Sequence, residues 1–413
     1  MIQKIKGTMD ILPDETPLFR YIEGVMREES ERYGFGEIRT PTFENTELFV
    51  RGVGDTTDVV QKEMYTFADR DENRSISLRP EGTAGVARAL IEHGKCSDTM
   101  PQKYYYIMSC FRHEAPQAGR SREFFQFGTE TFGSESPSAD ATSIALAASV
   151  LRRLKLSNVR LHINSIGCRE CRPAYREALV KYFSSHKDKL CDSCKKRLET
   201  NPLRLLDCKS EICSAIAKDA PKTTEHLCEG CQGHFDSLRK RLDAMGIEYT
   251  VNPSIVRGLD YYTRTVFEFI AEGIAAQSTV CGGGRYDGLV ESLGGPALSG
   301  IGFGMGITRV ILAMRQLGVA DVAIPAPKVY IAALGEDASV KSLEITERLR
   351  KSGVYAECDT MGRSLKAQMK YANKINAEYV LIIGDSEVEC GVAQLRNMAD
   401  GTQSEVALDS FSI

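Results

Sequence analysis

The chain has 413 residues, 42% of them hydrophobic and 26% charged, and a formal net charge of −4. This length allows two or three domains with a large core, and the composition is ordinary for a globular protein. No apolar run approaches the roughly 20 residues that span a bilayer, and the first residues, MIQKIKGTMDILPDE, lack a secretory signal. We therefore expect a cytoplasmic protein without a membrane segment, and the overall charge argues against a uniformly basic binder of nucleic acid.

Charge is unevenly distributed along the chain. Residues 151–250 contain 20 lysines and arginines against 13 aspartates and glutamates, a net charge of +7, which leaves the rest of the chain at −11. Such a segment is either an ordinary solvated surface of mixed charge or a local patch for an anionic polymer. Both interpretations stay open from charge alone.

A helix and a strand are predicted first. Residues 15–34 end in glycine and have apolar residues at helical spacing, namely Leu18, Ile22, Val25 and Met26. GFGEIRTPTFE then predicts a strand that Pro41 interrupts, because proline cannot donate to a strand ladder. Pro41 therefore belongs at an edge, a bulge or an interface.

SLRPEGTAGVARALIEHG predicts a turn followed by a helix, with Glu81, Gly82 and Thr83 at the turn. One interpretation is structural, with Thr83 as the residue that caps the helix. The other is functional, with the carboxylate and the hydroxyl holding a substrate ammonium group. Both interpretations remain open here.

A hairpin is predicted from KYYYIMSCFRHE and FFQFGTETFG, joined by the polar loop APQAGRSRE. Alternation puts on one face Tyr106, Met108, Cys110, Arg112 and Glu114 of the first strand and Phe124, Gln126, Gly128 and Glu130 of the second. The opposite face has the apolar pattern of a core, with Tyr105, Ile107, Phe111, Phe125 and Phe127. The first face is a solvated surface or the floor of a substrate site, and Gly128 favours the site because it permits close approach. DATSIALAASVLRRLKL then predicts a helix.

Thirteen cysteines are present, and eight of them fall between positions 168 and 231. Three pairs have C-x-x-C spacing, which in a chain without a secretion signal suggests thiolate–metal coordination rather than disulfides. The candidate ligands of a tetrahedral zinc site are Cys191, Cys194, Cys228 and Cys231, with Cys208 and Cys213 as replacements for either pair. Reduced thiols without a metal are the alternative. Strand and glycine patterns resume after residue 250, so residues 168–250 are predicted to be a cysteine-rich, basic insertion.

RGLDYYTRTVFEF, residues 257–269, predicts a strand in which Tyr261, Thr263, Thr265, Phe267 and Phe269 share one face. A strand does not need the polar residues at its start in order to fold, so Arg257, Tyr261 and Tyr262 indicate a small-molecule ligand. In the following CGGGRYDGL, the glycines form a tight turn or let the backbone approach that ligand.

GIGFGMG has glycine at every second position from 300 to 306, which is not the dinucleotide fingerprint. On a strand this spacing leaves one face without side chains, on which a planar base could lie. Arg309 stands in the first turn of the predicted next helix, where it could meet a phosphate. A glycine-rich turn with an unrelated arginine is the alternative.

After the stiff segment IPAP, residues 326–413 alternate strand and helix patterns. They predict a compact α/β domain with a mixed or parallel sheet.

Together these motifs resemble the class II aminoacyl-tRNA synthetases. YGFGEIRTPTFENTELF with Pro41 resembles their motif 1, FRHE to GRSREFFQFGTE resembles motif 2, and GIGFGMGITRVIL resembles motif 3. RGLDYYTRTVFEF and CGGGRYDGL resemble the two signatures of the histidyl-tRNA synthetase family. The resemblance covers essentially the whole chain, with the motifs in the family's order.

The resemblance implies an α+β catalytic domain with a mixed, mainly antiparallel sheet (residues 1–325), a mostly helical insertion (168–250) and a C-terminal α/β anticodon-binding domain (326–413). It implies histidine-binding roles for Glu81, Gly82, Thr83, Gln126, Glu130, Tyr261 and Tyr262. Glu81 and Thr83 would hold the ammonium group and Gln126 would lie near the carboxylate, while Glu130 and the two tyrosines would receive the imidazole. Catalytic and ATP-binding roles would fall to Arg112 and Arg257 at the α-phosphate, with Arg309 as a further ATP ligand.

The implied reaction has two steps, in which histidine and ATP with Mg²⁺ form histidyl-adenylate, and the histidyl group then moves to the 3′ end of tRNA(His). Arg120 and Arg122 would face the acceptor end, the insertion would lie over the acceptor stem, and motif 1 would build a homodimer. Two other functions are compatible with parts of this pattern. One is a histidine-sensing regulatory subunit of ATP phosphoribosyltransferase, which lacks the anticodon-binding domain. The other is a class II synthetase for proline or threonine, against which GLDYYTRTVFEF argues.

Overall fold

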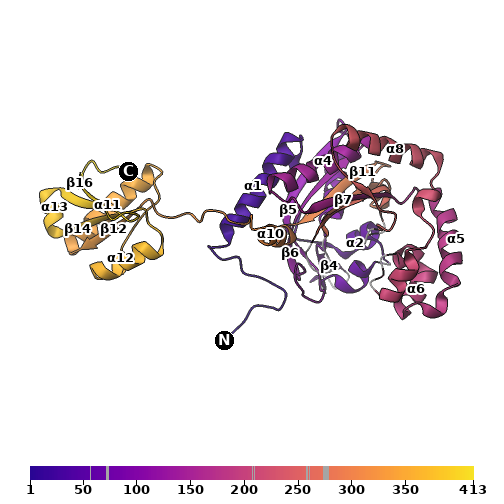
Figure 1. The fold of residues 1–413 in the computed structure, drawn as a ribbon, viewed down its shortest axis with the longest axis horizontal. Coiled ribbons are helices and arrows are strands. Elements are labelled where there is room, and N and C mark those ends of the chain that lie inside the picture. The colour runs from indigo at the N-terminus through magenta and orange to yellow at the C-terminus, as the bar shows by residue number, and fades with distance from the viewer. Residues whose placement is uncertain are drawn as a thin grey trace. The chain divides into compact units, whose positions relative to one another are not determined.

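The computed structural model describes residues 1–413 except Thr56, 71–73, Asp207, Lys209, Arg257, Gly258, Asp260 and 273–278. The described residues form two compact units, Met1–Val322 and Ala323–Ile413 (Figure 1). No described helix is long and apolar enough to cross a membrane.

An eight-stranded sheet organises the first unit, in the order β1-β5-β6-β11-β10-β9-β7-β8. Neighbouring strands from β5 to β7 in this order are antiparallel, while β1 and β8 pair in parallel at the edges. The strands are β1 (Gly36–Glu37), β5 (Gln102–Phe111), β6 (Glu123–Phe132), β7 (Val159–Ser165), β8 (Thr250–Val251), β9 (Thr263–Ala271), β10 (Thr279–Arg285) and β11 (Gly300–Gly306). The predicted mixed, mainly antiparallel sheet is confirmed.

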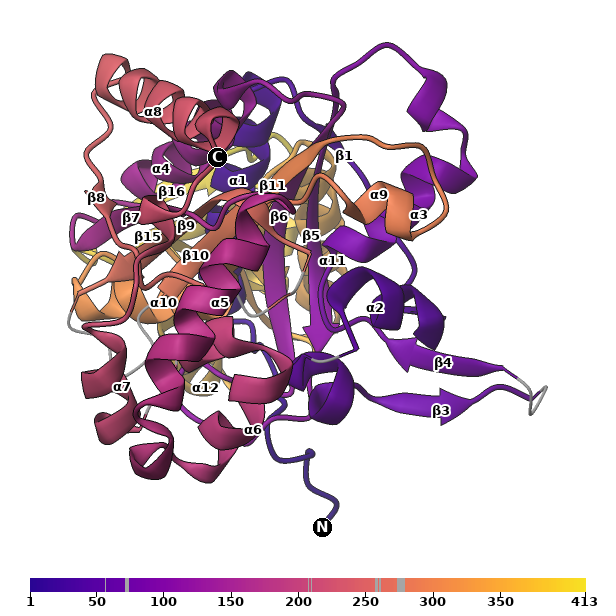
Figure 2. The same cartoon turned by 90° about the vertical axis from the view of Figure 1, so that its right-hand side faces the viewer.

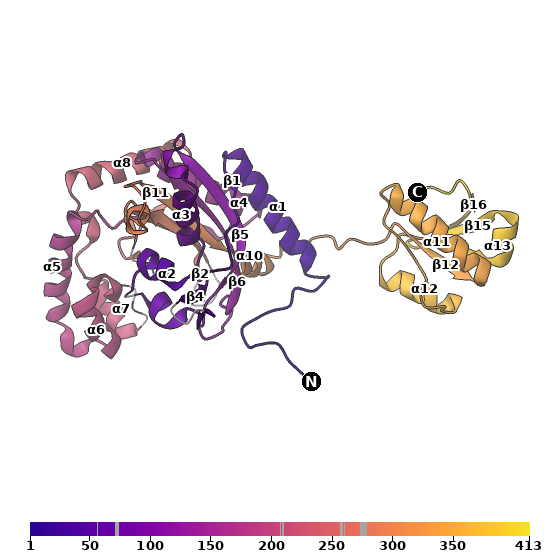
Figure 3. The same ribbon diagram turned by 180° about the vertical axis from the view of Figure 1, so that it is seen from behind.

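Long helices cover one face of this sheet and bury its main core. They are α1 (Thr16–Arg32), α4 (Pro137–Arg153), α8 (Glu229–Ala244) and α10 (Ile307–Gln316). The apolar residues predicted at helical spacing in α1 are buried in this core. Tyr105 and Phe127, from the apolar face of the hairpin, are buried there as well. Helix α1 lies beside β1, as Figure 3 shows. The main core therefore lies between these helices and the sheet, and the polar face of the hairpin is on the opposite side of the sheet.

A second, smaller core lies on the opposite face and includes Tyr106, Tyr262 and Tyr286. It is covered by α3 (Thr83–Glu92) and α9 (Leu289–Ser292). A three-stranded sheet in the order β2-β4-β3 adjoins it. The remaining elements of this part are β2 (Phe43–Asn45), α2 (Thr46–Val53), η1 (Val59–Glu63), β3 (Thr66–Ala68), β4 (Ser75–Leu78) and η2 (Lys95–Ser97). Pro41 separates β1 from β2, which belong to different sheets, so the predicted interruption is confirmed.

The described residues of 171–225 form a helical body with its own small core, which includes Tyr175, Leu179 and Phe183. Its elements are α5 (Cys171–Ser184), η3 (Lys187–Lys189), α6 (Asp192–Thr200), η4 (Pro202–Leu205), α7 (Glu211–Ala217) and η5 (Thr223–Glu225). Figure 2 shows α5, α6 and α7 gathered together in this body. Helix α8 differs, because its Phe235 and Leu238 pack into the main core.

The second unit is built around a mixed five-stranded sheet in the order β13-β12-β14-β15-β16. Strand β12 is parallel to both neighbours, whereas β15 is antiparallel to both of its neighbours. The elements are β12 (Val329–Leu334), α11 (Glu336–Lys351), β13 (Ala356–Cys358), α12 (Leu365–Lys374), β14 (Tyr379–Gly384), α13 (Asp385–Cys390), β15 (Val392–Asn397) and β16 (Gln403–Ala407). This agrees with the predicted α/β fold.

The predicted common face of Tyr261, Thr263, Thr265, Phe267 and Phe269 is wrong. Arg264 has a φ of 49°, and the register with β10 shifts between Gly284 and Arg285. This β-bulge breaks the period-2 alternation. Tyr261 consequently packs against the second core, whereas Phe267 and Phe269 lie in the main core.

Candidate functional site

Glu130, on β6, has no solvent exposure and is the centre of a hydrogen-bond network. Its Oε1 accepts hydrogen bonds from Thr83 Oγ1 at 2.7 Å and from the Tyr106 hydroxyl at 3.2 Å. Its Oε2 accepts one from the Tyr286 hydroxyl. Burial raises the pKa of Glu130 to about 8, opposed by the hydrogen bonds from Tyr286 and Thr83. Burial therefore favours the protonated form of this carboxyl.

Glu81 lies beside Glu130 at the start of α3. Its carboxylate accepts hydrogen bonds from the backbone N–H groups of Thr83 and Ala84, at 2.7 and 2.8 Å. The expectation that Thr83 caps the helix is therefore wrong: Glu81 satisfies the orphan N–H groups, and the hydroxyl of Thr83 reaches Glu130 instead. Burial raises the pKa of Glu81, while the two backbone hydrogen bonds oppose that shift.

Tyr261 completes this group, which we call the buried polar cluster: Glu81, Thr83, Tyr106, Glu130, Tyr261 and Tyr286. The ring of Tyr261 lies 4.6 Å from that of Tyr262 and 5.6 Å from that of Tyr286, between centroids. Burial, followed by the neighbouring Tyr262 and Glu81, raises the pKa of Tyr261. The phenol therefore stays protonated and can donate a hydrogen bond.

Tyr106 and Tyr286 were not predicted as site residues. Tyr286 lies within the CGGGRYDGL motif, and Tyr106 is opposite Gly128 in the register of the hairpin. A Cβ on Gly82 or Gly128 would lie 2.4 or 2.3 Å from the Tyr106 ring, so both glycines make room for it. The hairpin register itself was the available signal for Tyr106.

The glycines of β11 make room for the polar side chains of β6. A Cβ on Gly302 would lie 2.0 Å from Glu130 Oε2, and one on Gly304 would lie 2.1 Å from Gln126 Nε2. The face of β11 that was predicted to carry no side chains of its own is present. Side chains of the neighbouring strand β6 lie over part of it. Gln126 and Glu130 consequently lie on the same side of the sheet, each against a glycine of β11.

Gly302→Ala is expected to destabilise the first unit by about 1–3 kcal/mol, the usual cost of overpacking. The new methyl group would also lie 2.3 Å from the backbone oxygen of Thr129, which cannot move without disturbing the sheet. Thermal unfolding measures the effect. The matched control is Gly24→Ala in α1, where a Cβ would meet open space and helix propensity predicts a small gain. Equal stabilities of the two variants would contradict the close approach.

A cavity of about 530 Å³ adjoins Gln126, and among the described residues three arginines line it: Arg112, Arg120 and Arg309. The guanidinium of Arg112 lies 5.3 Å from the centroid of the Phe124 ring, and its Nε donates to the backbone oxygen of Pro80 at 2.9 Å. These two contacts hold the planar guanidinium at the wall of the cavity. We call this space the arginine cavity.

Arg309 is positioned by α10 and by two backbone oxygens. Its Nε donates to Gly119 at 3.0 Å and its Nη1 to Thr279 at 2.7 Å. Burial lowers the pKa of Arg309, and the neighbouring Arg120 and Arg112 add to this shift. Because the positive charges of Arg112, Arg120 and Arg309 line the same cavity, it is suited to an anion such as a phosphate.

The remaining predicted site residues differ in position. Arg120 lines the cavity and pairs with Glu114 at 2.9 Å. Arg122 is not among the described lining residues, and its backbone N–H donates to Gly7 at 2.7 Å. Arg257 lies outside the described residues. Gly82 contacts Tyr106, and the Tyr262 ring lies beside Gly284.

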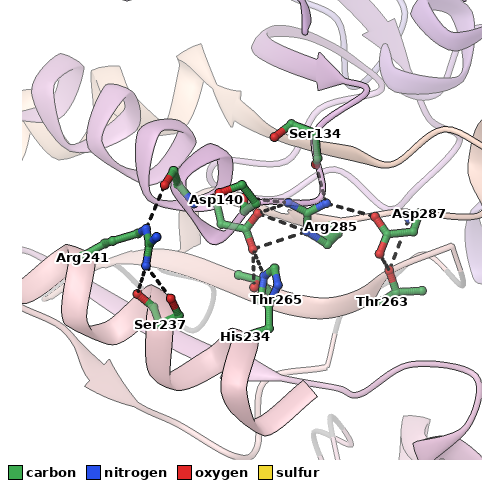
Figure 4. Close-up of polar contacts among 11 residues, drawn as sticks. Ser134, Asp140, His234, Ser237, Arg241, Thr263, Thr265, Arg285 and Asp287 are labelled. Atoms are coloured by element: carbon green, nitrogen blue, oxygen red, sulfur yellow. Dashed lines mark hydrogen bonds and ion pairs between the residues drawn. The ribbon is translucent and has the colours of Figure 1, made fainter. Parts of the chain in front are cut away.

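A buried ion-pair network supports β10 behind the site (Figure 4). Asp140, on α4, accepts hydrogen bonds from Thr265 Oγ1 and His234 Nε2, both at 2.6 Å. Arg285 pairs with Asp140 and, at 3.1 Å, with Asp287. The network joins α4, α8, β9 and β10 one residue before Tyr286, so it fixes the strand end from which Tyr286 reaches Glu130.

The predicted zinc set of Cys191, Cys194, Cys228 and Cys231 is wrong. The structure brings the cysteines together in two separate sets, Cys168/Cys171/Cys228/Cys231 and Cys191/Cys194/Cys208/Cys213. The two halves of the predicted set lie on different elements, since Cys191 precedes α6 and Cys228 precedes α8. Cys208 and Cys213 take the place of Cys228 and Cys231 beside Cys191 and Cys194, so the suggestion that they replace one pair is correct.

Comparison with known proteins agrees with these features. Residues 7–310 match the family model for histidyl-tRNA synthetase, and residues 328–412 match that for an anticodon-binding domain. The chain belongs to the histidyl-tRNA synthetase family.

Similar relatives and structures extend over nearly the full chain. The histidine–tRNA ligase of Caldanaerobacter subterraneus is 52% identical over 406 residues, covering 98% of this chain and 97% of the relative. That of Caldicellulosiruptor bescii is 51% identical, covering 99% and 97%. The crystal structure of the apo histidyl-tRNA synthetase of S. aureus has a TM-score of 0.83 at 38% identity, covering 99% of this chain and 98% of that one.

Proposed function

We propose that this protein is a histidine–tRNA ligase, which activates histidine with ATP and transfers it to the 3′ end of tRNA(His). The observation that carries the proposal is a buried polar cluster of carboxyl and phenol groups beside an arginine-lined cavity, in a chain of this family. The first suits an imidazole and an ammonium group, and the second suits a triphosphate.

The buried polar cluster would bind histidine. Glu130 and Tyr261 offer a carboxyl group and a phenol to the two ring nitrogens, with Tyr262 packed alongside. Glu81 and Thr83, at the Gly82 turn, would hold the ammonium group, and Gln126 would lie near the carboxylate at the edge of the arginine cavity. An amino acid without the imidazole nitrogens would leave buried polar groups unpaired, which gives specificity.

The arginine cavity would bind ATP. Arg112 and Arg257 would contact the α-phosphate where charge develops as the histidine carboxylate attacks, and Arg309 would bind the outer phosphates. Mg²⁺ would be bound with the phosphates, whose charge it neutralises, and the Glu114 and Glu268 carboxylates on the cavity wall are the oxygen donors that fit this ion. Fixed cations of this kind need no covalent enzyme intermediate.

Further parts of the proposal concern partners and location. The second unit would bind the anticodon, while Arg120, Arg122 and the basic helical body would contact the acceptor arm. The motif containing Pro41 would build a homodimer, and the enzyme would act in the cytoplasm. The family match of residues 328–412 to an anticodon-binding domain supports a ligase, because a ligase needs such a domain to bind its tRNA.

The direct test is ATP–pyrophosphate exchange by the purified full-length protein with each amino acid in turn. We expect exchange with histidine only. No exchange with any amino acid would favour a regulatory subunit, and exchange with proline or threonine would favour another synthetase.

Deletion of residues 326–413 is expected to preserve histidine-dependent exchange and to abolish most charging of tRNA(His). The first unit has its own cores, so activation should not need the second unit. Charging at the full-length rate would contradict the anticodon assignment.

Glu130→Gln is expected to weaken histidine binding by about 1.5–3 kcal/mol, the range for charge-assisted hydrogen bonds, because an amide cannot share a proton with the imidazole as the carboxyl group would. ATP affinity, measured on the same variant, is the control, and equal weakening of both ligands would argue against imidazole contact.

The same variant tests a pH dependence. The pKa of Glu130 is raised to about 8, and that of an unperturbed histidine side chain is about 6.5, so between these values one proton is available for the pair to share. Histidine affinity should fall below this range as imidazole gains a second proton, and above it as Glu130 loses its own. Calorimetry across pH should show that Glu130→Gln removes the alkaline decline.

A further inference from the structure

Eight cysteines of the first unit form two sets of four with nearly equal dimensions. In each set the sulfur atoms lie within 4.8 Å of one another. The Sγ atoms of Cys168 and Cys171 are 3.7 Å apart, those of Cys168 and Cys228 are 3.9 Å apart, and those of Cys191 and Cys208 are 3.9 Å apart. All eight are free cysteines.

These distances fit one tetrahedral metal ion in each set. With a zinc–sulfur bond of about 2.3 Å, the edge of a regular tetrahedron of sulfurs is about 3.8 Å. A disulfide requires about 2.05 Å between sulfurs, far less than the separations here. An iron–sulfur cluster has several irons and sulfides between its cysteines, and a group confined within 4.8 Å leaves no space for it.

The local backbone is also arranged for thiolates. Cys191 and Cys228 immediately precede α6 and α8, and Cys171 is the first residue of α5. Helix amino ends favour negative charge. In addition, the backbone N–H of Cys228 points to Cys171 Sγ at 3.1 Å, and that of Cys191 to Cys213 Sγ at 3.3 Å. These contacts occur in both sets, so each is a built site rather than a chance gathering of thiols.

We propose that the protein binds two structural Zn²⁺ ions. Site A consists of Cys168, Cys171, Cys228 and Cys231, and site B of Cys191, Cys194, Cys208 and Cys213. Four sulfur ligands close each coordination sphere, so neither ion has an open position for catalysis. The inference does not depend on the proposed ligase activity.

Site A joins the two chain segments through which the helical body connects to the rest of the first unit, and we call this place its neck. Cys168 and Cys171 lie where the chain leaves β7 for α5, and Cys228 and Cys231 lie where it returns into α8. Arg172, next to Cys171, donates to the backbone oxygen of Tyr262. Site A therefore fixes the helix start that contacts the Tyr261–Tyr262 segment of the candidate histidine pocket.

Site B stabilises the helical body itself and positions it. The small core of the body includes the ligands Cys194 and Cys213, and such short helices need a staple of this kind to stay folded. Cys191 and Cys208 line a cavity of about 500 Å³ together with Arg112. Arg197 of α6 also pairs with Asp58 at 3.1 Å, so site B lies on the side of the body that faces the arginine cavity.

The test is the zinc content of the full-length protein purified under reducing conditions, measured by plasma mass spectrometry. We expect two zinc ions per chain for the wild type and for Cys390→Ser, an exposed cysteine outside both sets. Cys231→Ser and Cys213→Ser should each retain one. A wild-type chain with eight free thiols and no metal, with disulfides in these sets, or with iron in place of zinc would overturn the proposal.

Double variants test the pairing. Cys171→Ser/Cys231→Ser removes two ligands of site A only and should retain one ion, whereas Cys194→Ser/Cys231→Ser should lose both. The opposite pattern would show that the sets are divided differently. Native mass spectrometry of the wild type gives the stoichiometry even if a variant fails to fold, and a mass increase of fewer than two zinc ions would contradict the proposal.

Discussion

Arg112→Ala should slow histidine-dependent pyrophosphate exchange by about 100- to 1,000-fold, the usual loss when one donor to a developing charge is removed. The guanidinium is held at the wall of the arginine cavity by Phe124 and by the backbone oxygen of Pro80. It is therefore pre-organised before ATP arrives, and little reorganisation is needed at the moment of reaction. The folded structure should survive, because Arg112 is only partly buried.

Two control variants distinguish a specific role of Arg112 in catalysis from a general effect of removing a positive charge. Arg112→Lys keeps the positive charge and loses the planar fork, so we expect an intermediate rate. Arg20→Ala removes an exposed arginine from α1 and should leave exchange within about twofold of wild type, as is usual for surface substitutions. An Arg112→Ala variant with wild-type exchange would remove this residue from the proposed mechanism.

Asp140→Ala should destabilise the first unit by about 3–5 kcal/mol, the range for breaking a buried ion pair from one side. Asp140 and Arg285 both have 0% exposure, so the variant removes the fully buried carboxylate from a buried guanidinium and leaves it only the partly exposed Asp287. His234 and Thr265 lose their acceptor as well. Denaturant unfolding, followed by a probe in the first unit, measures the change.

The control for Asp140 is an exposed ion pair of the same unit. Arg160 and Glu272 lie 3.5 Å apart with most of each side chain in solvent. Glu272→Ala should therefore cost less than about 1 kcal/mol. Similar losses in the two variants would contradict the buried network.

Acid should reduce the difference between wild type and Asp140→Ala. Burial opposes ionisation of Asp140, but the hydrogen bond from His234 and the charge of Arg285 prevail and lower its pKa. A carboxylate with a lowered folded-state pKa contributes stability above its unfolded value and loses it as the pH falls through the folded one. The two stability curves should therefore converge in strong acid.

Local pattern predicted the main helices and strands and part of the candidate site. The alternation of β5 and β6 placed Gln126 and Glu130 on one face, because side chains in a regular strand follow a period of two. The glycines of β11 likewise marked a side-chain-free face, and the resemblance to the family pointed to Arg112, Glu81 and Arg309. The roles of these residues remain predictions until the variants are measured.

Pairings between distant segments were decided only by the tertiary structure. Tyr286 meets Glu130 across 156 positions of sequence, and the bulge at Arg264 turned Tyr261 away from the face predicted for it. The cysteines paired as 168/171 with 228/231 because β7, α5 and α8 meet at the neck of the helical body. Spacing along a chain specifies which residues can act as a pair, but the packing of separate elements determines which pairs come together, because that choice depends on burial of the whole core.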